Sequence, residues 1–246
     1  FCRLLWTINF LPLKKTYLSL FMGCIFIIAC RKENYFDPAE TCESQTANPA
    51  GRSYATSSFV PVIYAKKQCG ILPLSNKNYW IYQDSVFNEG SFERVQYDTL
   101  RYTSTWKSLS DNLIWWESNI SLGLPERLYA NDSSIFQIDN RLFSPDMMDV
   151  KKEYGLFAGD SIRYLTNFED YAALGRSVKV QTTFKSPAGN FDNYILFEKN
   201  ARNFRKDQVY FKPGLGVIKY IMERASLGST IIKLQQVSTL VAFHIE

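Results

Sequence analysis

The sequence is poor in the residue on which many enzymes and metal sites depend, because its single histidine is His244, close to the C-terminus. A zinc site with paired histidines therefore has no second ligand. No calcium-binding loop pattern and no Gly-x-Ser-x-Gly turn is present. The segment Gly214-Leu215-Gly216 lacks the third glycine of a dinucleotide-binding loop, and we interpret it as a tight turn. We expect no metal and no cofactor, and interpret His244 as structural or superficial.

Paired carboxylates are the remaining route to catalysis. The candidate pairs are Glu169 with Asp170, Asp146 with Asp149, and Asp84 with Glu89. Glycoside hydrolysis needs two carboxylates about 5–10 Å apart across a cleft, whereas acidic residues near turns are usually solvated. A carboxylate-dependent hydrolase is therefore the least favoured function, and we expect a protein that is not an enzyme.

Neither sign of charge dominates the chain. It contains 28 basic and 24 acidic residues, and the first 30 residues include Arg3, Lys14 and Lys15 but no acid. The rest of the chain therefore carries 25 basic against 24 acidic residues. A protein that binds nucleic acid normally concentrates basic side chains on one face, and the basic clusters here are short. We expect no nucleic-acid partner.

The N-terminal segment has the composition of a secretory leader. Lys14-Lys15 precede an apolar run that ends at Cys30, and the chain becomes polar directly afterwards. The run is about as long as the apolar region of a signal peptide and shorter than the ~20 residues that span a bilayer. We interpret residues 1–29 as a leader. Residues 1–13 need not be native, because the chain begins with Phe1 rather than Met.

The end of the apolar run, Ile27-Ile28-Ala29-Cys30, resembles the lipobox of bacterial lipoproteins. The resemblance implies that a diacylglyceryl group is attached to the thiol of Cys30 and that cleavage makes this residue the N-terminus. Such a chain is anchored to a membrane without spanning it. We expect the cell envelope, at the outer membrane, on its periplasmic or its surface face. Cys24 fits less well, because Phe21 stands three residues before it; the alternative reading is a buried helix with an incidental cysteine.

Two cysteines remain outside the leader. Cys2 and Cys24 lie within it, and Cys30 is the lipidation candidate, which leaves Cys42 and Cys69. Disulfides form in compartments outside the cytoplasm, so this pair is a possible disulfide. Spacing alone does not supply the geometry of the bond, and two free thiols are the alternative.

The rest of the chain divides into a tether and one domain. Residues 30–58 are polar, rich in turn residues and without apolar periodicity, which predicts a lipidated tether. From 59 to 246 apolar residues recur mainly at every second position, as in 178–184. Glycine-containing turns such as 88–91 and 213–216 separate the runs. We predict a single, mainly β domain: a curved antiparallel meander or half-barrel.

Three irregularities are expected in this domain. Ser144-Pro145 is typical of a helix start and predicts a short helix over 146–152. A second short helix is predicted over 167–174, with Gly175 as its stop. The apolar alternation changes phase near Leu100, which suggests a β-bulge there.

Three patches resemble uncharacterised envelope lipoproteins of the Bacteroidota type. They are Leu72-Pro73-Leu74 with the Trp-x-Tyr strand Asn78-Tyr79-Trp80-Ile81-Tyr82, the Pro-Ala-Gly-x-Phe hairpin at 186–191, and the Pro-Gly-x-Gly-x-x-Lys hairpin at 211–220. The resemblance implies a curved antiparallel sheet exposed to the periplasm or the cell exterior. It brings no catalytic residue.

Aromatic residues are abundant and are the remaining candidates for a binding site. Core packing is their default role, but Trp80, Trp115 and Trp116, with Trp106, could stack on sugar rings or line an apolar groove. Trp115 and Trp116 face opposite sides if they lie in a strand. We favour a lipid-anchored, non-catalytic binding or scaffolding protein whose partner is an apolar ligand, a glycan or a protein. The alternative is a glycan-binding module that uses exposed tryptophans.

Overall fold

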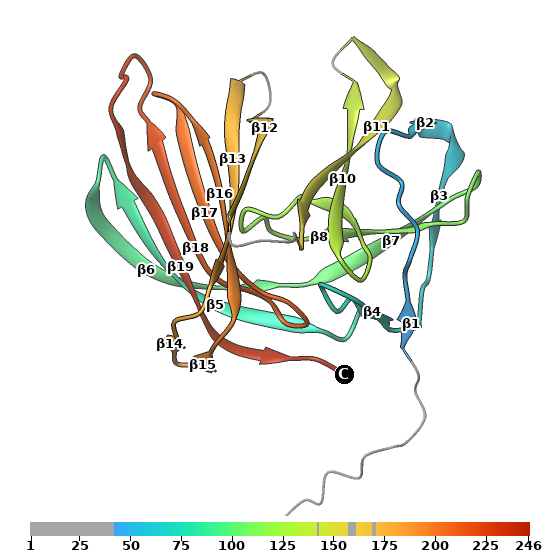
Figure 1. Ribbon diagram of the computed structural model, residues 1–246, viewed down its shortest axis with the longest axis horizontal. Helices are drawn as coiled ribbons and strands as arrows, with labels where there is room; N and C mark the ends of the chain where they lie inside the picture. The colour runs from blue at the N-terminus through green and yellow to red at the C-terminus, as the bar shows by residue number, and fades with distance from the viewer. Residues whose placement is uncertain (1–41, 142, 157–160, 169–170) are drawn as a thin grey trace, which may run out of the picture. The chain divides into compact units, whose positions relative to one another are not determined.

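Strands account for most of the chain, which confirms the mainly β fold class. The computed structural model describes residues 42–141, 143–156, 161–168 and 171–246, and residues 41–246 form one unit. The leader 1–29 and Cys30 lie outside the described residues. The unit contains two large antiparallel sheets (Figure 1).

The larger sheet has eight strands and curls as a half-barrel. In spatial order they are β12 (Ser161–Phe168), β13 (Tyr171–Val180), β16 (Tyr194–Ala201), β17 (Arg205–Lys212), β18 (Gly216–Ala225), β19 (Ile232–His244), β5 (Tyr79–Asn88) and β6 (Ser91–Leu100). Most neighbours are also successive in sequence, and glycine-containing turns join β5 to β6, β17 to β18 and β18 to β19. The two exceptions are β13, which pairs with β16, and β19, which pairs with β5, the first long strand of the chain.

The smaller sheet has seven strands. In spatial order they are β2 (Ser53–Ala55), β11 (Ser144–Gly155), β10 (Ser134–Arg141), β9 (Arg127–Ala130), β8 (Ile114–Ser118), β7 (Tyr102–Ser108) and β3 (Phe59–Val62). A single 3-10 turn, η1 (Thr56–Ser58), separates β2 from β3 in the described chain. Two minor pairs complete the fold: β1 (Glu43–Ser44) with β4 (Gln68–Cys69), and β14 (Phe184–Ser186) with β15 (Gly189–Phe191).

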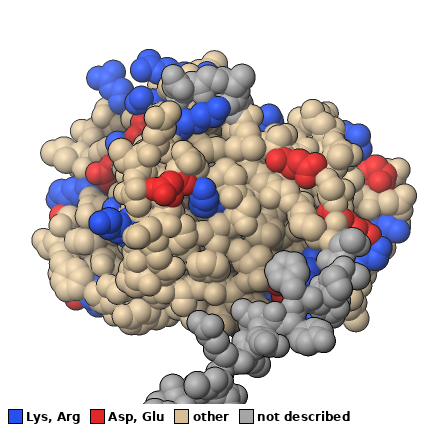
Figure 2. Space-filling model, turned by 60° about the horizontal axis from the view of Figure 1, so that its bottom comes forward, with Lys and Arg blue, Asp and Glu red and all other residues tan. Residues whose placement is uncertain are grey.

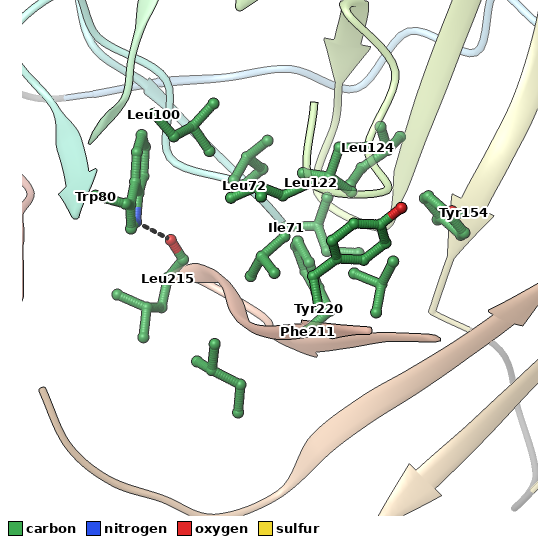
Figure 3. Packing of buried hydrophobic residues seen from close by; sticks show 14 of the residues in the cluster. Ile71, Leu72, Trp80, Leu100, Leu122, Leu124, Tyr154, Phe211, Leu215 and Tyr220 are labelled. Carbon is green, nitrogen blue, oxygen red and sulfur yellow. Dashed lines mark hydrogen bonds between the residues drawn. The ribbon is translucent and has the colours of Figure 1, made fainter. Parts of the chain in front are cut away.

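The main core lies between the two sheets. Trp80 and Phe211 of the larger sheet pack in one cluster with Trp116 and Tyr154 of the smaller one. The Tyr154 ring stacks on Phe197 with centroids 4.4 Å apart, so β11 and β16 are in direct contact. Figure 3 shows that apolar side chains from loops, including Ile71, Leu72, Leu122 and Leu124, fill the space between them.

Two of the sequence patches meet in this core. The Trp80 indole N–H donates to the Leu215 carbonyl over 2.8 Å (Figure 3). The Tyr82 hydroxyl donates to the Val217 carbonyl over 2.7 Å. Gly216 adopts φ +120°, and a Cβ there would lie 3.2 Å from a Leu72 methyl. The Trp-x-Tyr strand and the Pro-Gly-x-Gly turn therefore form one interlocked unit, with glycine at the closest approach.

A second core covers the opposite face of the smaller sheet. Trp115 packs there with Tyr54, Tyr129 and Phe136, whereas its neighbour Trp116 points into the main core. The opposite orientation predicted for the tryptophan pair is thus what the strand produces. Both faces of this sheet are buried at Trp115 and Trp116.

The folded unit begins earlier than the predicted tether allows. Strands β1 and β2 and the turn η1 fall within residues 42–58, and Tyr54 is buried in the second core. Alternation in the sequence did not reveal these strands, because each has only two or three residues and lies among polar turn residues. Cys42 and Cys69, the possible disulfide, are bonded to each other with their Cα atoms 5.5 Å apart, beside the β1–β4 pair.

Neither predicted short helix is present. Residues 146–152 lie in β11, where Met148 and Val150 face the second core at a spacing of two. Residues 167–168 end β12, and 171–174 begin β13. Gly175 is not a helix stop but a strand residue opposite Tyr164, whose ring occupies the place of a Cβ. Long-range pairing therefore overrides the local Ser-Pro and glycine signals.

The bulge expected near Leu100 is not in the β5–β6 pairing, which is regular from Val86 to Trp80, but a register shift lies just beyond it, between Tyr102 and Ser104 of β7. Gln96, Asp98 and Leu100 of β6 are partly or fully buried, while Val95 and Tyr97 between them are exposed. The apparent phase change arose from treating these two apolar residues as buried. The chain instead leaves the larger sheet at Arg101 and enters the smaller sheet as β7.

Among the described residues, no helix has the length and apolar character needed to cross a membrane.

Candidate functional site

A cleft of about 1090 Å³ opens between the two sheets beyond the main core. Strands β10 and β11 line one side, β12, β16, β17 and β18 contribute to the other, and the loop between β8 and β9 forms part of the floor. The cleft is mainly charged and polar, with three phenylalanines, Phe143, Phe168 and Phe204, among its lining residues. The same inter-sheet space is therefore packed at one end and open at the other.

The lining balances the two signs of charge. The basic side chains are Arg127, Arg141, Lys151, Lys199, Arg205 and Arg224, and the acidic ones are Glu126, Asp139, Asp149, Glu153 and Asp207. Three of the acids form ion pairs within the cleft, with Arg141, Lys199 and Arg205. Among the described residues, Lys151 and Arg224 have no ion-pair partner. They are exposed and able to meet a ligand.

An ion pair on the floor connects the two sheets. The Lys199 ammonium donates to the Glu153 carboxylate over 2.6 Å, and these side chains are only 13% and 9% exposed. The Lys199 ammonium also lies 4.6 Å from the centre of the Phe168 ring, and the Arg205 guanidinium lies 4.9 Å from the same ring. Two cations therefore hold one aromatic side chain in place at the edge of the cleft.

Beside this pair is a second buried network. The Arg205 guanidinium donates two hydrogen bonds of 2.8 Å to the Asp207 carboxylate, and the Tyr220 hydroxyl donates to the same carboxylate over 3.0 Å. A two-pronged pair of this kind is geometrically strict. The cleft floor is thus pre-organised by fixed charges rather than by mobile side chains.

Local charge sets the ionisation of the lining carboxylates. Hydrogen bonds from Arg141 and then from the Ser53 hydroxyl lower the pKa of Asp149 to about 2. Burial raises the pKa of Asp139, an effect that nearby Lys151 opposes. The Asp149 carboxylate is therefore held as an anion, which suits binding better than donation of a proton.

The loop between β8 and β9 forms part of the cleft floor, and a glycine in it, Gly123, packs against both sheets. Gly123 adopts φ +75°, its carbonyl accepts a hydrogen bond of 2.7 Å from the Tyr154 hydroxyl, and a Cβ there would collide with Val209 and with the Tyr220 ring. Its neighbours Leu122 and Leu124 reach into the main core. The loop is therefore locked between the sheets and separates the packed end from the open end.

The three candidate stacking tryptophans are not surface residues. Trp80, Trp115 and Trp116 are 1%, 1% and 0% exposed, so they cannot offer an open face to a ligand, which corrects that expectation. They are in the cores because each lies at an inward-facing strand position. The partly buried Trp106 does line a small cavity of about 170 Å³, with Trp115 at its wall. Among the described residues, no group accepts a hydrogen bond from the buried Trp115 indole N–H.

The described members of the candidate carboxylate pairs lie in different surroundings. Asp84 is completely buried in β5, whereas Glu89 lies in a surface turn and pairs with Lys233. Asp149 lines the cleft but is paired with Arg141, and Asp146 does not line it. Glu169 and Asp170 lie outside the described residues. No three His, Cys, Asp or Glu side chains of the described part gather as a metal site.

Figure 2 shows one face of the molecule on which uncharged side chains predominate and acidic and basic side chains are scattered among them.

His244 lies at the end of β19, where its ring stacks on Tyr79 with centroids 5.6 Å apart, in keeping with a structural role.

Sequence reasoning missed the residues of the cleft floor. Lys199, Asp207 and Glu153 occupy buried positions in otherwise alternating strands. The one feature of the sequence that could have indicated them is a charged residue at a strand position where the alternation calls for an apolar one. It predicts a buried ion pair but does not identify the partner, which here comes from the other sheet for Lys199.

Comparisons with known proteins give little beyond this geometry. No protein-family model matches the chain, and no curated protein matches it. A crystal structure of a protein classed provisionally as a lipoprotein, from Parabacteroides distasonis ATCC 8503, is similar at 11% sequence identity. The match covers 72% of this chain and 100% of that chain, with a TM-score of 0.36, so the resemblance is loose.

Proposed function

We propose that the chain is a lipoprotein of the cell envelope that binds a polar ligand in its inter-sheet cleft without catalysing a reaction. The anchor rests on the basic, apolar and lipobox-like segments that end at Cys30. A Cys42–Cys69 disulfide suits an oxidising compartment. Since the first strand starts at Glu43, the intervening residues 31–42 reach at most about 40 Å when fully extended.

The anchor can be tested by labelling cells with an alkyne-tagged fatty acid. The full-length chain should take up the label and fractionate with membranes, and a Cys30→Ala variant should do neither. A Cys24→Ala variant is the matched control, because it removes the other leader cysteine and should leave both properties unchanged. Labelling that survives Cys30→Ala would contradict the anchor.

The observation that supports binding is the open, charge-lined cleft above a closed core. Its nearly balanced charge suits neither a polyanion nor an apolar molecule. Lys151 and Arg224, which lack ion-pair partners among the described residues, lie with phenylalanines and the Asn140 amide in the lining, and the Arg224 guanidinium is 5.4 Å from the centre of the Phe204 ring. These groups suit a segment that carries carboxylates, hydroxyls or amides together with small apolar faces. We infer a short stretch of peptide or glycan as the ligand class, and a partner that is not nucleic acid.

An array printed with peptides and glycans tests the cleft directly. The full chain should bind a subset, and Lys151→Glu with Arg224→Glu should lose that binding by reversing the two free cations. The control is Lys179→Glu with Lys185→Glu, which makes the same change of net charge at exposed positions outside the cleft. Binding that survives the first pair, or an absence of any bound ligand, would contradict the proposal.

A second candidate function is favoured by the cavity at Trp106. The unpaired indole N–H of Trp115 calls for an acceptor, and Asn140 and Arg127 also line this cavity. A sugar ring stacked on Trp106 would present hydroxyl oxygens to such donors. Glycan binding that is lost in Trp106→Ala but kept in the double cleft variant would favour this site over the cleft.

A further inference from the structure

The four edges of the two large sheets are protected to very different degrees. An edge strand has backbone N–H and C=O groups free on one side, which can pair with another strand. On the smaller sheet the edges are β2, with three residues, and β3, with four residues including Pro61. Short strands and proline discourage pairing. On the larger sheet the edges are β12 and the ten-residue β6.

Strand β6 combines an open edge with exposed apolar side chains. In the described part of the chain it pairs with β5 alone, and Figure 1 shows it at the outer limit of the larger sheet. Phe92, Val95 and Tyr97 are 61%, 44% and 65% exposed. Such side chains on a long open edge favour association by addition of another strand.

The sequence of β6 is complementary to itself in one antiparallel register. Two copies related by a twofold axis must pair residues of equal parity, because only every second residue directs its backbone groups to the open edge. With the axis at Gln96, Arg94 stands opposite Asp98 of the second copy, and Val95 stands opposite Tyr97. Both kinds of cross-strand pair are stabilising.

Neighbouring registers lose this match. An axis at Val95 would place Arg94 opposite Gln96, and an axis at Tyr97 would place Gln96 opposite Asp98. Only the axis at Gln96 brings the opposite charges together twice. The pairing would centre on residues 94–98, because the Asn119 amide already donates to the Thr99 carbonyl near the end of the strand. Within one copy Arg94 contacts the adjacent Glu93 and Gln96, whereas Asp98 accepts a hydrogen bond from Gln96 and also lies beside the buried Asp84 of β5. Both charged ends are therefore accessible to a second copy.

We propose that two copies of this chain associate through antiparallel pairing of their β6 strands about Gln96, which joins their eight-stranded sheets into one. The occupant of this edge is a second copy because the charge and apolar patterns match under a twofold axis. Anchoring both copies in one membrane would raise their effective concentration at the edge. This association is independent of the ligand proposed for the cleft.

Site-directed disulfide formation in the full-length chain tests the register. At the axis the two Gln96 Cα atoms would lie about 4.5–5.5 Å apart, within reach of a disulfide. Gln96→Cys should therefore give a covalent dimer on mild oxidation. The control is Thr99→Cys, on the same strand, because the two copies of this residue would be about 20 Å apart at ~3.3 Å per residue. Equal dimer yields from the two variants, or none from Gln96→Cys, would overturn the proposal.

A charge exchange in the Gln96→Cys background separates pairing from chance collision. Adding Arg94→Asp should reduce the dimer yield about tenfold or more, because each cross-strand attraction becomes a repulsion. Adding Asp98→Arg as well should restore the yield, because the opposite charges are then exchanged in the same register. Circular dichroism checks that each variant keeps its strands. A yield insensitive to the first change, or not restored by the second, would contradict the association.

Discussion

The inter-sheet space is packed at one end and open at the other, although β16 and β17 contribute side chains to both ends. At the closed end, Trp80, Tyr82 and Leu72 fill the space, and the polar atoms of the two aromatic side chains donate to carbonyls of the β17–β18 turn region. At the open end β16 and β17 carry Lys199 and Asp207, which form ion pairs with Glu153 and Arg205. Apolar packing therefore joins the sheets at one end, whereas at the other end ion pairs line an open cleft and one of them links the two sheets.

The largest expected effect breaks the closed end. Trp80→Ala should lower the free energy of unfolding by about 3–5 kcal/mol, because it removes a fully buried ring and leaves the Leu215 carbonyl without its donor. Denaturant unfolding at neutral pH measures the change. A loss below about 1 kcal/mol would show that the closed end is not the main source of stability.

The next effect is at the boundary between the two ends. Gly123→Ala should cost about 2–4 kcal/mol, because the residue has a positive φ and a methyl group would collide with Val209 and Tyr220. Gly228→Ala is a suitable control, since φ is also positive, at +79°, but nothing lies within 4 Å of a Cβ there. Equal losses in the two variants would attribute the whole effect to backbone conformation.

A smaller effect, of opposite sign, is expected at Asp84. This residue is buried in β5, and its carboxylate oxygens have no well-formed hydrogen bond within the described chain. Burial raises the pKa of Asp84 to about 6. The folded state thus keeps this proton at a pH where the unfolded state has lost it. The stabilising contribution is complete below about pH 4 and is lost as the pH rises through 6.

Asp84→Asn should therefore stabilise the fold by about 1–3 kcal/mol at pH 7.5 and have little effect at pH 4. Denaturant titrations at both pH values measure this difference. Asp149→Asn provides a contrast, because the pKa of Asp149 is lowered to about 2 and its neutral substitution should not stabilise the protein at pH 7.5. An Asp84→Asn variant that is destabilised equally at both pH values would contradict the account.

The smallest effect is expected in the open end. Arg224→Ala or Lys151→Ala should change the free energy of unfolding by no more than about 0.5 kcal/mol, because both side chains are exposed and lack ion-pair partners among the described residues. Thermal unfolding measures the change. A large loss of stability would mean that these cations serve the fold rather than a ligand.

The fold class could be predicted from the sequence because alternation and glycine turns are local features. The turn at 88–91 and the turn at 213–216 both lie where the pattern places them. The helices predicted over 146–152 and 167–174 failed because their strand character depends on partners distant in sequence. Gly175 illustrates the reason: only the packed Tyr164 ring shows why glycine is needed there.

The cleft could not be predicted in the same way. Its floor depends on Glu153 meeting Lys199, two residues from different sheets, and no local pattern encodes that meeting. The prediction that Trp80, Trp115 and Trp116 stack on a ligand was wrong for a related reason. The sequence shows that large aromatic rings are present, but it does not show whether they face the core or the solvent. Val95 and Tyr97 show the converse, because they are apolar residues that the fold leaves exposed.

The attachment of the folded unit to a membrane can be measured most directly by mass spectrometry of the N-terminal peptide from the membrane-extracted chain. The account predicts that this peptide starts at Cys30 and carries the mass of a thioether-linked diacylglyceryl group. A chain that starts before Cys30, or that starts there with an unmodified thiol, would contradict it.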